Sequence, residues 1–185
     1  MPTIRSRRSL PRCASRAAII TALLLLVPLL AMRFSDEVDW SPMDFAMASV
    51  LLFGAGFAFE LAIRNTTGLA ARVAIALLIG ATLLLVWANL AVGILGNEDN
   101  PANVAYFAVP LIGIVGAALA HTRPRGMAAT AAAMAVVMVL LAVFALFMRS
   151  ESEHTGTTQI LLLHGLFAGT YLVAAGLLQR IASRH

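Results

Sequence analysis

Long apolar runs alternate with short polar breaks along the whole chain. A helix that spans a bilayer needs about 20 mostly apolar residues. Six runs come near this length, and they are residues 17–32, 43–63, 73–95, 104–120, 127–148 and 158–178. The first run is the weakest, because it is short and contains Pro28. The pattern therefore predicts an all-α bundle of six transmembrane helices over residues 17–180, between a basic tail at 1–16 and a short tail at 181–185.

Composition supports a membrane protein. Of the 185 residues, 61% are hydrophobic and 12% are charged, whereas soluble domains are about half apolar and a quarter charged. The net charge of +4 does not indicate nucleic-acid binding, since the arginines are not clustered on a soluble domain. The single cysteine, Cys13, excludes a disulfide framework and a cysteine-based metal site. We predict a lipid bilayer as the surroundings, no nucleic acid, no metal and no cofactor.

Arginine placement predicts how the chain is threaded, because cytoplasmic loops carry an excess of positive residues. With the N-terminus inside, 11 of the 13 arginines fall on the inner side, and only Arg33 and Arg149 fall outside. Of the nine acids, only Glu60 falls towards the inside. We therefore expect a multi-pass protein of the bacterial inner membrane with both termini cytoplasmic. A cleaved signal peptide is the alternative for the first run, but "PLLAMRFS" lacks a small-x-small cleavage site.

The outer loops carry polar residues that suit helix caps. In "SPMD", Ser41 is placed to cap, Pro42 to begin the helix, and Asp44 to complete a capping box. In "GNEDNPAN", Gly96 follows the third run as a helix C-terminal glycine, and Asn100 and Pro101 begin the fourth helix. The alternative is a hard-cation site made from outer-loop oxygens; the candidate residues are Glu98, Asp99, Asn100 and Asn103.

Asn89 cannot be explained as a cap, because it falls six residues inside the third run. It shares one helix face with Thr82 and Gly93. Polar groups at membrane depth face the bundle interior, where they bond neighbouring helices or line a pathway. A hydrogen bond between helices is the simpler interpretation of Asn89, and a functional pathway is the alternative.

His164 falls at a similar depth in the sixth run, with Tyr171 seven residues later on the same face. The interpretations are a structural histidine or a proton-responsive one. Next to it, Gly165 and Gly169 form a small-xxx-small pattern that lets another helix approach closely. This face is predicted to bind a second copy or another subunit of a membrane complex.

Glu60 is the single acid in the inner half of a run. Its simpler interpretation is an i,i+4 ion pair with Arg64 near the cytoplasmic surface. An ionisable residue inside the membrane is also a candidate functional residue.

The outer-half polar residues suggest one common pocket. Asp44, Asn89 and His164 fall in the outer half of three different runs. If their helices are neighbours, these side chains share a polar pocket beneath the "GNEDNPAN" loop. Its rim would then be aromatic, and the expected rim residues are Trp40, Trp87 and Tyr106.

Several motifs resemble those of a group of small, uncharacterised bacterial integral membrane proteins. They are "VDWSPMDF", "AFELAIR", "VWANLAVGILGNEDNPANVAYF" and "RPRGMA". The resemblance covers roughly residues 38–143. The resemblance implies a bacterial membrane location and brings no established activity. It does not extend to the basic tail, the first run or the last run, so it lends no support to His164.

Three classes of function fit a chain of this kind. A non-enzymatic membrane component fits best, as a small transporter-like protein or an accessory subunit of a complex. An intramembrane enzyme is an alternative, although the sequence contains neither HExxH nor GxSxG. A redox protein with haem b is a further alternative. It would need two axial ligands at matching depth, whereas His121 falls at the inner end of the fourth run and His164 in the outer half of the sixth.

Overall fold

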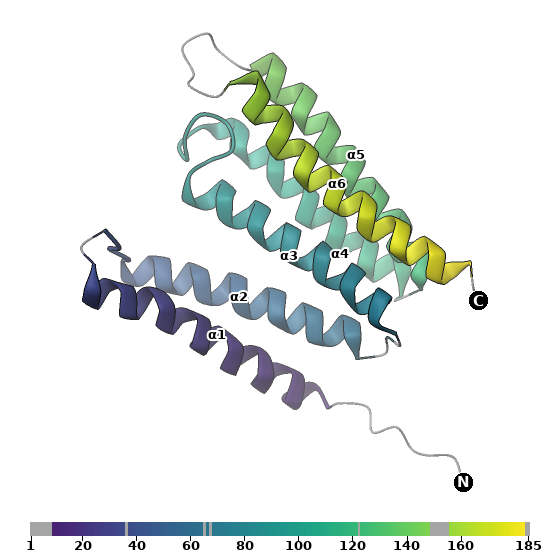
Figure 1. Ribbon diagram of the computed structural model, residues 1–185, viewed down its shortest axis with the longest axis horizontal. Coiled ribbons are helices and arrows are strands. Elements are labelled where there is room, and N and C mark those ends of the chain that lie inside the picture. Colours follow the sequence, from purple (N-terminus) through teal and green to yellow (C-terminus); the bar gives the residue numbers. More distant parts are fainter. Residues whose placement is uncertain are drawn as a thin grey trace. The chain divides into compact units, whose positions relative to one another are not determined.

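The computed structural model describes residues 9–35, 37–64, 66, 68–121, 123–148 and 156–183. These residues are mostly helical and contain no strand, which confirms the predicted all-α class. Six helical segments within them are long and apolar enough to cross a membrane. The elements are α1 (Leu10–Phe34), α2 (Pro42–Ile63), α3 (Leu69–Ala91), the 3₁₀ helix η1 (Pro101–Phe107), α4 (Ala108–Ala120), α5 (Pro124–Met148) and α6 (Thr157–Ala182) (Figure 1).

The chain divides at Thr66 into two compact units. The first unit is the hairpin of α1 and α2. Its buried side chains are mostly small and recur every four residues on α1, at Cys13, Ala17 and Thr21. A Cβ at Gly56 on α2 would lie 3.6 Å from the Cβ of Ala17, which is ordinary contact. Small residues therefore let the two helices pack closely, and the larger apolar side chains face outwards.

Helix α1 begins earlier than the sequence predicted. It starts at Leu10, so residues 10–16, which were predicted to be a tail, form its first turns. Pro11 lies in the first turn, where its missing N–H costs no helix hydrogen bond. Arginine is also a good helix former, so the helix includes the arginine-containing stretch at residues 10–16 that precedes the apolar run. Residues 1–8 of the predicted tail lie outside the described part.

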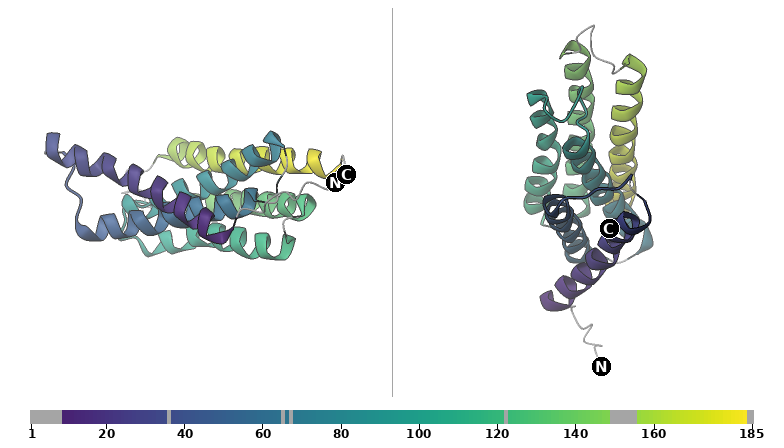
Figure 2. Two further views of the ribbon diagram at one scale, coloured as in Figure 1. Left: turned by 90° about the horizontal axis from the view of Figure 1, so that it is seen from below. Right: turned by 90° about the vertical axis from the view of Figure 1, so that its left-hand side faces the viewer.

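The second unit contains α3 to α6. Helix α6 packs along α5 on one side and along α3 on the other. Helix α4 packs on α5, and η1 contacts α3. The other views show α5 and α6 side by side over most of their length (Figure 2). The four helices thus form a bundle whose order in space is α3, α6, α5 and α4.

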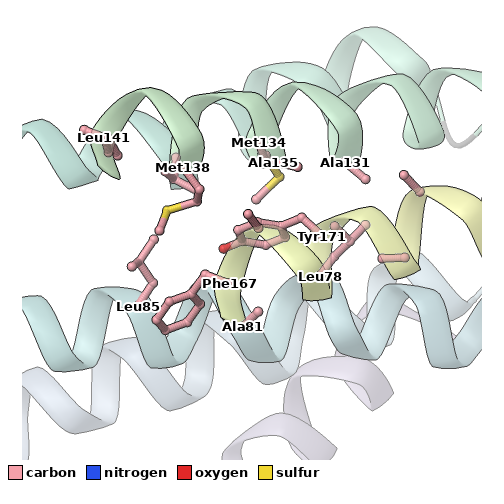
Figure 3. Packing of buried hydrophobic residues seen from close by; sticks show 14 of the residues in the cluster. Leu78, Ala81, Leu85, Ala131, Met134, Ala135, Met138, Leu141, Phe167 and Tyr171 are labelled. Atoms are coloured by element: carbon pink, nitrogen blue, oxygen red, sulfur yellow. The ribbon is translucent and has the colours of Figure 1, made fainter. Parts of the chain in front are cut away.

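The interior of this bundle combines alanines, methionines and other aliphatic side chains with the aromatic rings of Tyr106, Phe167 and Tyr171. Phe167 and Tyr171 project from α6 towards α3 and α5 (Figure 3). Met138 on α5 points towards Leu85 on α3, and both are fully buried. Lipid is as apolar as these side chains, so close van der Waals packing rather than removal from water holds the helices together.

Helix α3 ends four residues before the predicted boundary, at Ala91 instead of Leu95. Gly93 follows with a φ of +69°, a left-handed conformation that interrupts the helix. Ile94 and Leu95 are buried, but they lie in the loop. The apolar run therefore continues beyond the helix, which explains why hydropathy placed the boundary too late.

Candidate functional site

The loop after α3 is held by one asparagine side chain. The Oδ1 atom of Asn103 accepts hydrogen bonds from the backbone N–H of Ile94 (3.0 Å) and of Leu95 (2.9 Å). Its Nδ2 atom donates to the carbonyl oxygen of Asn97 at 2.6 Å. Asn103 is buried, so its amide replaces the hydrogen bonds that these loop groups would otherwise lack. The sequence placed Asn103 only among candidate cation ligands and did not predict this role.

Asn89 ties the end of α3 to the same residue. Its Nδ2 donates to the backbone carbonyl of Asn103 at 3.0 Å, and its side chain is buried. Because α3 ends at Ala91, Asn89 lies in the last turn of the helix and not six residues inside it. Its Oδ1 atom is buried and has no hydrogen-bond partner. This oxygen is the one unsatisfied buried side-chain atom among the described residues.

His164 on α6 is linked to η1. Its Nδ1 lies 2.7 Å from the carbonyl oxygen of Ile160, one turn earlier, and its Nε2 lies 2.7 Å from the hydroxyl of Tyr106. A carbonyl only accepts, so Nδ1 carries the proton, and in the neutral ring Nε2 accepts from Tyr106. Tyr106 was expected at an aromatic rim, but it is 1% exposed. It is therefore an interior partner of the histidine.

A second polar link joins α3 to α6. The Thr82 hydroxyl lies 3.2 Å from the Tyr171 hydroxyl, and it also donates to the carbonyl of Leu78 at 2.7 Å. Thr82 and Tyr171 lie seven residues from Asn89 and His164 respectively. Polar contacts therefore recur along the inner faces of α3 and α6.

Asp44 belongs to the first unit and forms a helix cap. Its Oδ2 accepts from the backbone N–H of Ser41 (2.7 Å) and from the Ser41 hydroxyl (2.8 Å). The Ser41 hydroxyl in turn accepts from the backbone N–H of Asp44 at 3.2 Å. The predicted capping box is confirmed. Asp44 is exposed and its carboxylate is engaged in the cap, while Asn89 and His164 bond to other residues of the second unit.

The candidate cation ligands in the loop after α3 form a helix cap and an exposed turn. Asn100 accepts from the backbone N–H of Ala102 at 3.0 Å, ahead of Pro101, so the predicted cap is present. It begins η1, and α4 starts only at Ala108. Glu98 and Asp99 are exposed. Within the described ranges, no group of three or more His, Cys, Asp or Glu residues is placed to hold a metal ion.

Glu60 in the first unit lies beside an arginine of the neighbouring helix. Its Oε2 is 3.9 Å from Nη1 of Arg16 on α1, and the residue is 9% exposed. The sequence considered only Arg64 as its partner, because spacing along one helix does not show which helix lies opposite. The ion pair lets a carboxylate lie at the buried α1–α2 contact.

Several polar side chains of the second unit join one segment of that unit to another. Asn103 fixes the loop, Asn89 and His164 fix η1 against α3 and α6, and Thr82 joins Tyr171. Asn89 and His164 each bond to a different residue of η1, so they share this segment without bonding to each other. The chemistry that these groups support is hydrogen bonding between segments.

Comparisons with known proteins identify no family for this chain: no family model, no curated protein and no solved structure matches it. The resemblance noted from the sequence motifs therefore stays a prediction.

Proposed function

We propose that the protein is a non-enzymatic, multi-pass component of the bacterial inner membrane, with both termini cytoplasmic, that acts as an accessory subunit of a membrane complex. The six membrane-length helices support the membrane part of this proposal. The arginine distribution and the sequence resemblance support the orientation and the bacterial membrane. The assembly role rests on one face of α6.

That face carries three glycines without neighbours. Gly165, Gly169 and Gly176 lie four and seven residues apart, which places them on one stripe of the helix. A Cβ built at any of them meets nothing within 4 Å. Exposed leucines border the stripe, including Leu162 and Leu172. We define these three glycines as the α6 glycine face.

Other glycines of the same unit lie at close helix contacts. A Cβ at Gly126 on α5 would lie 2.7 Å from the Cβ of Ala120 on α4, and one at Gly116 would collide with Thr130. The unit thus uses small residues where its own helices approach each other. The α6 glycine face is a surface of the same kind that no described helix of its own unit approaches, and small residues at membrane interfaces let helix backbones come close.

A small transporter is the second candidate, and Asn89 is the observation that favours it. Its unsatisfied Oδ1 is buried among polar groups of α3 and η1. An unpaired buried acceptor costs about 1–3 kcal/mol, so this oxygen suits a water or a passing polar ligand. The accessory role is preferred, because both ring nitrogens of His164 already have partners.

The test is affinity purification from native membranes in mild detergent. The wild-type chain is expected to retain a stoichiometric polypeptide partner, and the double substitution Gly165→Leu with Gly169→Leu is expected to lose it. The matched control is Gly80→Leu on α3, where a Cβ also meets nothing within 4 Å. Both variants should fold, since the new side chains have open space.

Retention of the same partner by the double variant would contradict the proposal. Recovery of the wild-type chain without any polypeptide partner would contradict it as well. The identity of the partner shows which kind of assembly forms. A second copy of this chain indicates a homo-oligomer, and a different chain indicates that the protein is an accessory subunit.

A further inference from the structure

The flank of α4 and α5 has an apolar groove that ends at two arginines. A groove of about 600 Å³ runs between the two helices and is lined by Leu111, Val115, Ala129 and Ala133, among others. A second hollow of about 670 Å³ is lined by Arg123 and Arg125. Leu119, Ala120 and Gly126 line both, so the two hollows adjoin.

Small residues on α5 open this groove. Gly126, Ala129 and Ala133 lie on its α5 side, where larger side chains would fill it. On the α4 side, Leu111 and Val115 are exposed apolar walls. Thr130 also lines the groove, with its hydroxyl bonded to the carbonyl of Gly126, and the other lining residues are glycine or apolar. The charged residues lie at one end.

The charge at that end is positive, and no described acid of the same unit lies beside it. Arg123 and Arg125 are exposed, and neither guanidinium forms an ion pair or hydrogen bond with a described residue. The other charged groups at this end of the described bundle are Arg72 at the start of α3 and Arg180 in the last turn of α6. The described acids of the second unit, Glu98 and Asp99, lie in the loop at its opposite end.

The length of the groove corresponds to one leaflet. Ala133 follows Arg125 by eight residues, which is about 12 Å along the helix at 1.5 Å per residue. Half of the hydrocarbon core of a bilayer is about 15 Å thick. The arginines at the start of α5 therefore lie at headgroup depth when the groove lies beside acyl chains.

We propose that this groove binds an anionic phospholipid, with its phosphate at Arg123 and Arg125 and one acyl chain between α4 and α5. Two unpaired guanidiniums attract a phosphate group, and basic pockets beside transmembrane helices bind anionic headgroups. The apolar groove leads from the same point into the hydrocarbon region, where an acyl chain fills it. The proposal does not depend on the α6 glycine face, which lies on another helix.

The headgroup contact is tested by native mass spectrometry of the full chain in phosphatidylcholine nanodiscs that contain phosphatidylglycerol. Because each arginine near the surface contributes about 1 kcal/mol to binding of anionic lipid, Arg123→Gln with Arg125→Gln should weaken phosphatidylglycerol retention about thirtyfold. The control Arg72→Gln removes a charge at the same end of the unit but outside the groove, and it should retain the lipid. Equal retention by the double variant and the wild type, or an equal loss in the control, would overturn the proposal.

The acyl-chain contact is tested by filling the groove. Ala133→Phe should release the bound lipid, whereas Val136→Phe, at an exposed position of α5 outside the groove, should retain it. Inorganic phosphate should bind far more weakly than the lipid, and equal affinity would overturn the proposal.

A photo-crosslinking residue at position 133, used in native membranes, identifies the occupant directly. A crosslink to phospholipid supports the proposal. A crosslink to another polypeptide, or to residues 9–66 of this chain, would overturn it.

Discussion

At the scale of single residues, Asn103 has the largest set of side-chain hydrogen bonds at the loop after α3. We predict that Asn103→Ala lowers the free energy of unfolding by about 2–4 kcal/mol, because it leaves the N–H groups of Ile94 and Leu95 and the carbonyl of Asn97 without their partners. Equilibrium unfolding in detergent measures the change. Asn97→Ala is the control, since Asn97 contributes its backbone carbonyl, which alanine also has. A loss in the control as large as that in Asn103→Ala would refute the assigned role.

A second prediction at this scale concerns Tyr106 and His164. Tyr106→Phe removes the donor to Nε2 and is expected to destabilise the protein by about 0.6–1.7 kcal/mol, the range of hydrogen bonds between membrane helices. In a His164→Leu background the same substitution should cost clearly less. The measurement is a double-mutant cycle on unfolding free energies, and a coupling energy near zero would show that the contact contributes nothing.

The bonding partner of a side chain could be predicted from the sequence only where it is local. The Ser41–Asp44 box and the Asn100 cap follow from residue types at fixed spacing, and both are present. The partners of Glu60 and His164 are Arg16 and Tyr106, which come from other helical segments. Spacing along one helix contains no information about such neighbours.

At the scale of elements, the end of α3 depends on Gly93. Its positive φ disfavours any residue with a Cβ, and a Cβ there would also collide with the carbonyl oxygen of Asn97. We predict that Gly93→Ala lowers the unfolding free energy by about 1–3 kcal/mol. Gly80→Ala, within the same helix and in open space, should be neutral or stabilising. Thermal unfolding of the two variants in one detergent compares them, and equal midpoints would contradict this account.

Hydropathy predicted the existence of each helix but not where α3 ends. Val92, Gly93, Ile94 and Leu95 continue the apolar run, so their hydropathy resembles that of a helix. The helix ends because Gly93 turns left-handed and because Asn103, from the next segment, supplies the hydrogen bonds that the loop needs. Because α3 ends at Ala91, Asn89 is close to the end of the helix. Asn89 therefore lies in the last turn of α3, and not six residues inside the helix as the apolar run predicted.

At the scale of the whole molecule, the arginine distribution predicts the topology. Reporter fusions after Arg64, Arg123 and Ser183 should report a cytoplasmic location, and fusions after Ser35 and Asp99 should report the outside. The physical reason is the retention of arginine-rich loops on the cytoplasmic side. A cytoplasmic signal after Asp99 would contradict the proposed threading.

The six-helix architecture was the part of the whole molecule that the sequence predicted best, because membrane helices are long and apolar whatever their neighbours. The single pocket of Asp44, Asn89 and His164 was an inference about neighbours. In the structure Asp44 takes part in the cap of α2, and Asn89 and His164 bond to Asn103 and Tyr106. Function therefore could not be derived from shared depth alone.

The central proposal is that the α6 glycine face binds another membrane chain, and photo-crosslinking in intact membranes tests it most directly. A photo-crosslinking residue at Gly169 is compared with one at Gly80, since both positions have open space. We predict that position 169 crosslinks to a second polypeptide in high yield and that position 80 crosslinks to lipid. Crosslinks from position 169 only to lipid, or to residues 9–66 of the same chain, would contradict the proposal.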